Sequence, residues 1–368
     1  MGLTRYRLGD LIETVDARNV YGITKVLGLN KDKEFMPTAA NTESVDLSKY
    51  KVVKKGRFAF SGMQTGRDKC IRIGMYDIDS EDAVISPAYT TFEVNTSDVI
   101  NPTYLFMLFN SKERDRLGWF CSDSSIRSNL DWNRFCDFDL ALPPINIQQK
   151  YVDIYNAMVA NQKCYEDSLE DLKLACQLEI ENLRASWPQQ KIGNYIVQVN
   201  EKNTNEEIIL EQGININKEF ITPQRPNQSL KGRRIVRQGQ FAYCTQLNNE
   251  NVAIAYRDDE DCVVSSVYNV FEIRNRDLCA DYLLQWLVRP EFGRYVYWAS
   301  SGSAYEFLSY ESLCDYVIPI PSLEVQQYIS CLYRACQTRA KINERMKAQI
   351  KNICPILIKG SLEEASKA

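Results

Sequence analysis

The side chains that most enzymes use for chemistry are missing or wrongly spaced in this sequence. None of its 368 residues is histidine, so the chain lacks Ser-His-Asp and Cys-His nucleophile pairs and the usual general base for neutral pH. Its twelve cysteines include no Cys-x-x-Cys pair, which argues against a zinc ribbon or a thioredoxin-like motif. We expect most of them to be buried as small apolar residues in a reducing cytoplasm.

Other catalytic motifs are incomplete. The segment Asn101-Pro102-Thr103-Tyr104 lacks the second proline of the Asn-Pro-Pro-aromatic motif with which amino-methyltransferases hold a target base, and we interpret it as the start of a helix. A Gly-Lys-Ser/Thr phosphate loop and a glycine-rich S-adenosylmethionine loop are both absent. The acidic segments 77–82 and 258–261 could bind Mg²⁺ in a nuclease, but solvated turns are the simpler interpretation. The sequence therefore predicts no catalytic residue and no metal site.

The residues best suited to contact DNA lie in a basic segment. Between positions 54 and 72 the local charge balance is +5, whereas the whole chain carries −4. Loop 61–67 joins two expected strands here. Its glycines would permit close approach to a backbone, and its side chains could reach base edges or phosphates. Solvated hairpin turns beside charged strand faces are the alternative. The candidates in this segment are Lys54, Arg57, Gln64, Thr65, Arg67 and Lys69.

Three further segments complete the candidate DNA-binding set. Loop 245–251 is the counterpart of loop 61–67 in the second half of the sequence. It is rich in amides that suit adenine edges. Loop 124–129 corresponds to 302–307, where Arg127 could bind phosphate or guanine and Tyr305 could stack or bond to phosphate. Helix caps would also explain the serines of these loops. The candidates, with the basic residues before loop 245–251, are Arg127, Asn129, Arg233, Arg234, Gln246, Asn248, Asn249, Ser303 and Tyr305.

The segments recur because the sequence is a tandem duplication. Matches follow one another in the same order, at offsets that fall from 184 to 178 residues. The clearest are Leu8-Gly9-Asp10 with Ile192-Gly193-Asn194, Gly56-Arg57-Phe58-Ala59-Phe60 with Gly239-Gln240-Phe241-Ala242-Tyr243, 83–94 with 262–273, and Pro143, Gln148 and Gln149 with Pro321, Gln326 and Gln327. Each copy is a globular segment followed by a tail that begins just after the proline and the glutamine pair.

The globular segments are predicted to be rich in strands and the tails to be long helices. Apolar and polar residues alternate, as is typical of strands, in 57–61, 69–75, 83–94, 240–245, 252–256 and 262–273. Short helices are expected after Asn101-Pro102 and over 280–288. The tails 147–186 and 325–355 repeat apolar residues every three or four positions, and Pro355 should end the second. Helices this long exceed one small domain, so we expect them to pair as an antiparallel coiled coil, with helical hairpins inside each copy as the alternative.

Composition agrees with this organisation. Apolar residues make up 45% and charged residues 25%, the balance of a folded soluble protein of two or three domains. Neither a signal peptide nor a membrane helix is predicted, so we expect a cytoplasmic protein. The predicted fold is α+β, with strand-rich domains over 1–146 and 187–324 and helical spacers over 147–186 and 325–368.

The arrangement resembles the specificity subunit of Type I restriction-modification systems over nearly the whole chain. The resemblance rests on the Pro-to-Gln-Gln entry into each helix, the Gly-Asp or Gly-Asn pair near each domain start, and the Gly-x-Phe-Ala-aromatic strand in each copy. It implies that each globular segment is a target recognition domain and that the helices form a spacer that docks methyltransferase subunits.

The resemblance also implies what the chain would bind. The target would be double-stranded DNA with a bipartite, asymmetric sequence, because two different domains would each read one half-site. Two methyltransferase subunits would bind S-adenosylmethionine and restriction subunits would use ATP and Mg²⁺, so this non-catalytic chain would bind no cofactor itself. A protein-binding coiled-coil scaffold, which the acidic composition favours, and the specificity part of a fused restriction-methylation enzyme are the alternatives.

Overall fold

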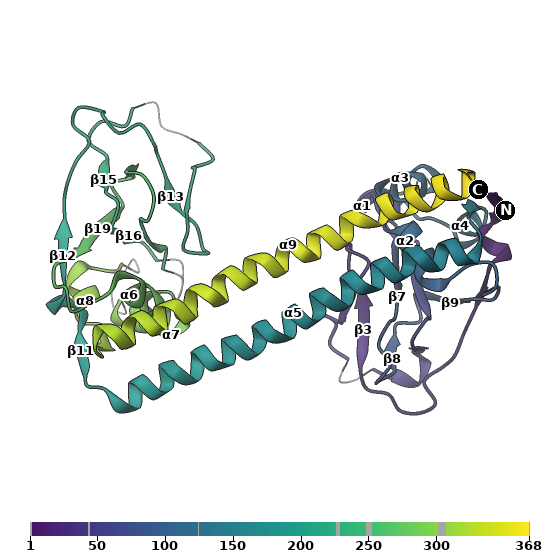
Figure 1. The fold of residues 1–368 in the computed structure, drawn as a ribbon, viewed down its shortest axis with the longest axis horizontal. Coiled ribbons are helices and arrows are strands. Elements are labelled where there is room, and N and C mark those ends of the chain that lie inside the picture. The colour runs from purple at the N-terminus through teal and green to yellow at the C-terminus, as the bar shows by residue number, and fades with distance from the viewer. Residues whose placement is uncertain are drawn as a thin grey trace. The chain divides into compact units, whose positions relative to one another are not determined.

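The computed structural model describes residues 2–42, 45–123, 125–225, 229–247, 252–300 and 307–367. It contains two compact units, Met1–Glu166 with Ile342–Ala368, and Asp167–Lys341. Each unit holds one copy of the repeat and parts of two long helices, α5 (Ile145–Ser186) and α9 (Leu323–Lys367). The predicted α+β fold, in which each strand-rich region is followed by a long helix, is confirmed (Figure 1).

The first unit is built on two four-stranded sheets and one strand pair. Its strands are β1 (Thr4–Arg7), β2 (Ile12–Thr14), β3 (Val26–Leu29), β4 (Phe35–Pro37), β5 (Lys51–Val53), β6 (Phe58–Ser61), β7 (Arg72–Met75), β8 (Ala83–Ile85), β9 (Thr90–Val94) and β10 (Asp139–Leu142). One sheet has the order β2-β9-β6-β7, the other has the order β4-β3-β8-β5, and β1 pairs with β10. The predicted strand 83–94 is interrupted after Ile85, so that β8 and β9 enter different sheets.

The second unit repeats the first of these sheets. Its strands are β11 (Gln189–Lys191), β12 (Ile196–Val199), β13 (Gly213–Ile214), β14 (Phe220–Ile221), β15 (Arg234–Val236), β16 (Phe241–Cys244), β17 (Ile254–Tyr256), β18 (Cys262–Val264), β19 (Tyr268–Ile273) and β20 (Val317–Pro319). The order β12-β19-β16-β17 matches β2-β9-β6-β7, while β13-β14, β15-β18 and β11-β20 are pairs. Phe241 stacks on Phe271 with ring centroids 4.9 Å apart, as Phe58 does on Phe92 at 4.9 Å, so the duplication extends into the core.

Short helices pack against these sheets. They are α1 (Thr65–Asp68), α2 (Pro102–Phe109), α3 (Lys112–Cys121), α4 (Trp132–Cys136), α6 (Ala280–Leu287), α7 (Pro290–Ser300) and α8 (Tyr310–Cys314), with 3₁₀ helices at Leu8–Asp10, Leu47–Lys49 and Ile192–Asn194. The helix predicted after Asn101-Pro102 is α2. The Asn101 side chain accepts a hydrogen bond from the amide of Thr103 at 2.8 Å, and Pro102 stands in the first turn, where no helical N–H partner is lost.

Helix α9 is longer than the sequence predicted. It continues through Pro355 to Lys367. Cys354 and Leu357 are buried in the core of the first unit, whereas Pro355 is exposed, so that water can reach the carbonyl that loses its helical partner. The expectation that Pro355 ends the helix was therefore wrong. In the described part of the chain, no helix combines the length and the apolar character needed to cross a membrane.

The two long helices pack together antiparallel in the first unit. Lys150 Nζ, near the start of α5, lies 2.8 Å from Glu364 Oε2, near the end of α9. Further along α5, Gln162 Nε2 donates to Asn343 Oδ1 at 2.9 Å, and both side chains are buried. The expected antiparallel pairing is confirmed, and the buried polar pair fixes the register of the two helices.

Candidate nucleic-acid interface

Two candidate loops of the first unit lie directly against each other. The amide of Leu130 donates to the carbonyl of Gly62 at 2.8 Å, and the amide of Gly66 donates to the carbonyl of Ser128 at 2.9 Å. Segment 61–69 and residues 123 and 125–130, which were separate candidates in the sequence, therefore form one continuous surface. We call this surface the loop pair.

The glycines of the loop pair serve this contact. A Cβ atom on Gly62 would lie 1.8 Å from the carbonyl oxygen of Leu130, and one on Gly66 would lie 2.5 Å from Cβ of Ser128. Only glycine permits such approach without moving the neighbouring backbone. The glycines thus allow close packing of the second loop of the same unit. The sequence had suggested instead that they allow close approach to a DNA backbone.

The second unit joins its candidate loops in the same way. The amide of Leu308 donates to the carbonyl of Thr245 at 2.9 Å, and Gln246 forms an isolated β-bridge with Phe307. Leu308 and Thr245 are the repeat counterparts of Leu130 and Gly62. The candidates Asn248, Asn249, Ser303 and Tyr305 lie outside the described residues.

Several cations of segment 54–72 form ion pairs with carboxylates of the same unit. Arg57 is only 5% exposed. Its Nε donates to Glu93 Oε1 at 2.8 Å and its Nη1 donates to the carbonyl of Val52 at 2.7 Å. Lys55 and Arg72 are likewise paired with neighbouring aspartates. A buried, paired guanidinium cannot reach a phosphate, so we leave Arg57 out of the proposed interface.

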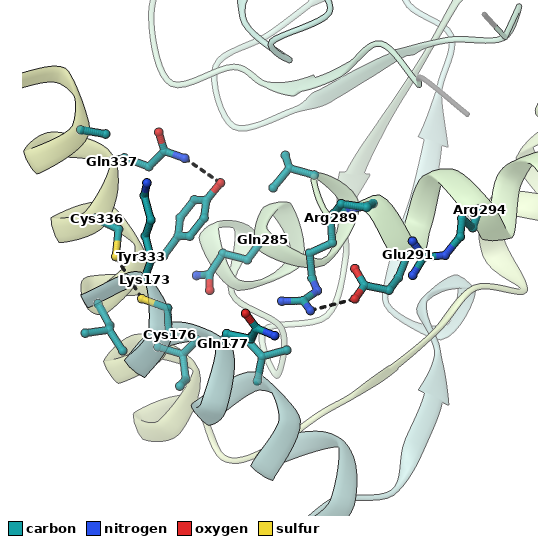
Figure 2. A pocket seen from close by; sticks show the side chains of 16 residues that line it. Lys173, Cys176, Gln177, Gln285, Arg289, Glu291, Arg294, Tyr333, Cys336 and Gln337 are labelled. Atoms are coloured by element: carbon teal, nitrogen blue, oxygen red, sulfur yellow. Dashed lines mark hydrogen bonds and ion pairs between the residues drawn. The ribbon is translucent and has the colours of Figure 1, made fainter. Parts of the chain in front are cut away.

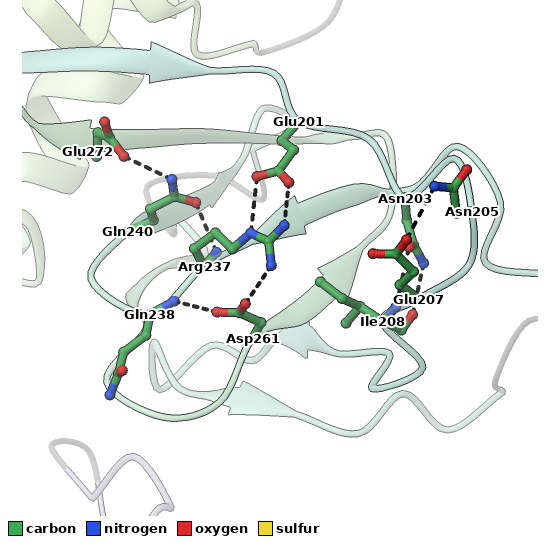
Figure 3. A network of polar contacts seen from close by, with 10 residues as sticks. All are labelled: Glu201, Asn203, Asn205, Glu207, Ile208, Arg237, Gln238, Gln240, Asp261 and Glu272. Carbon is green, nitrogen blue, oxygen red and sulfur yellow. Dashed lines mark hydrogen bonds and ion pairs between the residues drawn. The ribbon is translucent and has the colours of Figure 1, made fainter.

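In the second unit, the position that corresponds to Arg57 is occupied by an amide, Gln240. Gln240 Nε2 donates to Glu272 Oε2 at 2.9 Å (Figure 3). Beside it, Arg237 lies between Glu201 and Asp261, with Nη1 2.7 Å from Asp261 Oδ2. The hydrogen bond from Arg237 holds the pKa of the Asp261 carboxyl below its ordinary value. At least this carboxylate of segment 258–261 therefore has a structural cation as its partner.

Three other candidates are held by bonds within their own unit. Thr65 is buried, and its hydroxyl donates to the carbonyl of Gly62 at 3.0 Å. Asn129 Oδ1 accepts from the amide of Gln64 at 3.3 Å. Arg234 Nη1 donates to Asn200 Oδ1 at 3.0 Å. These side chains support the loops and strands from which the exposed candidates project.

The remaining candidates offer solvent-facing groups. Lys54, Arg67, Lys69, Arg127 and Gln246 are exposed, and Gln64 and Arg233 are half-buried. The Lys69 ammonium lies 4.9 Å from the ring centroid of Trp119 in α3. The loop pair of the first unit therefore carries Arg67, Lys69 and Arg127 as exposed cations, which suit phosphate oxygens or guanine.

Exposed aromatic residues that none of the sequence motifs indicated also lie near the loop pair. They are Trp119 and Phe120 at the end of α3, with Tyr297 and Trp298 in α7 at the matching positions of the second copy. The signal that could have found them is an Arg-x-x-aromatic-aromatic sequence repeated at an offset of 178 residues.

The repeated glutamine of the helix entry is structural. Gln148 is fully buried, and its Nε2 donates to the carbonyls of Val99 and Pro143 at 2.8 Å each while its Oε1 accepts from the amide of Asn101. Gln326 makes the three equivalent bonds in the second unit. Each glutamine thus ties the start of a long helix to the start of a short one, which explains why the motif occurs twice.

The second unit also contains a cavity of about 540 Å³ between the long helices and the α6–α7 region (Figure 2). Arg289 Nη2 lies 3.0 Å from Glu291 Oε1 on one side, and the thiols of Cys176 and Cys336 lie 3.1 Å apart on the other. Burial raises the pKa of Cys176 to about 12, so the reactive thiolate is not formed near neutral pH. Among the described residues, no group of three metal-ligating side chains occurs.

Comparison with known proteins gives a result only at the level of structure. No family model and no curated protein matches the sequence. The crystal structure of the Type-I restriction-modification system S subunit from M. genitalium matches with a TM-score of 0.58 and 11% identity, covering 99% of this chain and 96% of that chain. This chain therefore has the fold of a Type I restriction-modification specificity subunit.

Two further solved structures cover similar shares of the chain. The HsdS subunit from Thermoanaerobacter tengcongensis has 16% identity, covers 98% of this chain and 96% of its own, and gives a TM-score of 0.44. A chain from a structure on complex assembly and conformational transition of the type I R-M system has 16% identity, 99% and 97% coverage, and a TM-score of 0.48.

Proposed function

We propose that this chain is the sequence-specific DNA-recognition subunit of a Type I restriction-modification complex. The observation that carries the proposal is the duplicated loop pair, closed by Leu130 on Gly62 and by Leu308 on Thr245, in a chain with the fold of a specificity subunit. Two related but different surfaces suit two different half-sites. The target would be bipartite, asymmetric double-stranded DNA.

In this proposal the strand-rich domains and the helical spacers have separate tasks. Residues 1–146 and 187–324 are the target recognition domains, and 147–186 and 325–368 are the helical spacers that set the half-site separation and dock two methyltransferase subunits. Exposed cations such as Arg67 and Arg127 bind phosphates or guanine edges. The chain supplies sequence recognition in the cytoplasm and has no catalytic residue of its own. S-adenosylmethionine, ATP and Mg²⁺ bind to the methyltransferase and restriction subunits.

Mapping N6-methyladenine in the host genome tests the proposal. Long-read sequencing would compare strains with the gene intact, deleted, and restored from a plasmid. We expect a two-part motif that is lost on deletion and returns with the plasmid. Exchange of residues 1–140 for the matching segment of another such chain should change one half of the motif only. Methylation that is identical in all strains, or exchange that alters both halves, would contradict the proposal.

Salt dependence of duplex binding separates DNA recognition from a protein scaffold. Phosphate contacts release counterions, so the association constant should fall steeply between about 50 and 200 mM salt. A scaffold that binds protein would show a flat response with duplex DNA. The measurement is fluorescence anisotropy of a labelled duplex titrated with the full chain.

A further inference from the structure

Each unit exposes a pair of large aromatic side chains at the same place in the repeat. Trp119 and Phe120, in the last turn of α3, are 48% and 85% exposed. Tyr297 and Trp298, in α7, are 45% and 72% exposed. Leaving large apolar side chains in water forgoes the free energy that their burial would contribute. The two copies differ in most residues, yet both retain this exposed pair, so an accidental surface residue does not account for it.

The fold holds the aromatic pair of the first unit against the loop pair. Gly118 lies just before the pair, where an added Cβ would be 2.4 Å from Ile71 and 3.5 Å from the Thr65 side chain. Close packing at Gly118 therefore fixes the end of α3 next to α1, which follows Gly62 in the loop pair. Both aromatic side chains remain exposed at this fixed point.

Each aromatic pair has at least one exposed cation nearby. Arg116 is exposed one helical turn before Phe120, and Arg294 is exposed one turn before Trp298. In the first unit the Lys69 ammonium lies 4.9 Å from the Trp119 ring centroid. Glu113 of the same helix and Asp123 are the nearby carboxylates, and the side chain of Asp123 is occupied by amide and hydroxyl groups of its own loop.

We infer that both aromatic pairs are DNA contacts of the recognition domains. The rings of Trp119 and Phe120 pack against deoxyribose and base edges next to the bases read by the loop pair, and Arg116 binds the flanking phosphate. Tyr297 and Trp298 act in the same way in the second half-site, with Arg294 as the phosphate contact. The inference rests on the proposed function, because it adds residues to the surface that would read each half-site.

Duplex DNA is the partner that the charges favour. Exposed arginine and lysine side chains beside apolar rings match a polyanion whose sugars and base edges are apolar. Arg67, Lys69 and Arg127 continue the same charge into the loop pair. A docked protein subunit is the other partner that aromatic and arginine side chains could serve, and the experiment below includes it as an outcome.

The test uses the full chain and a fluorescein-labelled pool of duplexes with a random central segment. Phe120→Ala and Trp298→Ala should each weaken binding about 5- to 100-fold, since aromatic contacts to nucleic acid have that range of effect. The salt slope of these variants should stay that of the natural chain, because no phosphate contact is removed. Arg116→Gln should instead lower the slope by about one. Tyr21→Ala and Ile209→Ala, at side chains 86% and 83% exposed, are the matched controls.

The possible outcomes separate the inference from the proposed function. A natural chain that binds the duplex pool without salt dependence would contradict the proposed function. A natural chain that binds as expected, with aromatic variants equal to the two controls, would overturn the inference alone. Variants that keep their DNA affinity but no longer copurify with a coexpressed methyltransferase subunit would show a protein interface and overturn it as well. Thermal unfolding should be unchanged in all variants, because the substituted side chains are exposed.

Discussion

Lys33 Nζ lies 2.8 Å from Asp115 Oδ1, and the second copy of the repeat has no carboxylate at the position of Asp115. Lys218 takes the place of Lys33, with a φ of 63° against 66°, and donates to the carbonyl of Leu287. The counterpart of Asp115 is Gly293. Burial without a carboxylate lowers the pKa of Lys218 to about 8.

Replacing Lys218 by methionine should stabilise the protein. Its pKa of about 8 in the folded state is below the ordinary value of 10.5, so the charged form is disfavoured by folding. In the natural chain, stability should therefore rise between pH 8 and 10.5, where the unfolded chain binds more protons. We expect Lys218→Met to add about 1 kcal/mol at pH 7, less than the whole shift implies because the amine is only half-buried. Urea unfolding at several pH values measures the free energy of unfolding. In the Lys218→Met variant, this free energy should not rise between pH 8 and 10.5.

Lys33→Met is the matched control with the opposite sign. Removing the ammonium leaves the half-buried Asp115 without its cation, and we expect a loss of about 1 to 3 kcal/mol in the free energy of unfolding. Equal effects of the two substitutions in the same urea experiment would contradict the difference between the copies.

Gln148→Ala should destabilise the first unit strongly. It would leave the carbonyls of Val99 and Pro143 and the amide of Asn101 without their buried partner, at a cost of about 2 to 3 kcal/mol. The neighbouring Gln149 is exposed, so Gln149→Ala should cost less than about 0.5 kcal/mol. Chemical unfolding of the two variants side by side gives the comparison, and similar values would argue against the structural role of the motif.

The buried pair Gln162 and Asn343 should behave non-additively. Asn343→Leu alone removes one of the two acceptors of Gln162, the other being Glu166, and should cost about 1 to 3 kcal/mol. The double variant Gln162→Leu with Asn343→Leu should recover part of this, since two apolar side chains need no partner and Glu166 keeps its bond from Lys347. A double-mutant cycle on unfolding free energies measures the coupling. Additive losses would mean that the two side chains do not depend on each other.

Gly62→Ala should separate the two segments of the first loop pair. The added Cβ would overlap the carbonyl oxygen of Leu130, so the backbone has to move. We expect methylation at targets of the natural motif to fall at least about tenfold, with stability lower by about 1 to 3 kcal/mol. Gly28→Ala is the control, because its nearest neighbour, the Tyr89 hydroxyl, would be 3.9 Å from the new atom. A methylation pattern equal to that of the control would contradict a role for the loop pair.

Arg57 and Arg67 should differ in their effect on DNA binding. Arg57→Gln reproduces the residue found at the same place in the second copy, and should leave the salt slope unchanged. Arg67→Gln removes an exposed cation and should lower the slope by about one. Anisotropy titrations of the same duplex at four salt concentrations distinguish the two, and a lowered slope for Arg57→Gln would put that side chain back into the interface.

The repeat and the long helices could be predicted because their signals are local. An offset between matched segments is read directly from the sequence, and apolar residues at spacings of three and four span dozens of positions in α5 and α9. The strands β1 to β5 were not predicted, because each has only three or four residues and lies outside the segments where apolar and polar residues alternate clearly.

The candidate site was harder to predict because exposure depends on distant residues. Arg57 is buried and bonds to Glu93, 36 positions later in the sequence. Nothing in its own segment distinguishes it from the exposed Arg67. The contact between Gly62 and Leu130 likewise joins segments that are 68 residues apart. Residue types identified the loops, whereas the three-dimensional packing decides which side chains in them are free.

The first unit includes residues from both ends of the sequence, and this has a consequence for synthesis on the ribosome. Cys354 and Leu357 belong to its core, and the Ser361 hydroxyl bonds to the buried hydroxyl of Tyr104 at 2.6 Å. During translation at about 5 to 20 residues per second, the first half would wait roughly 10 to 40 s for these residues. The nascent first domain would meanwhile expose apolar surface, which makes it a substrate for chaperones until the last helix emerges.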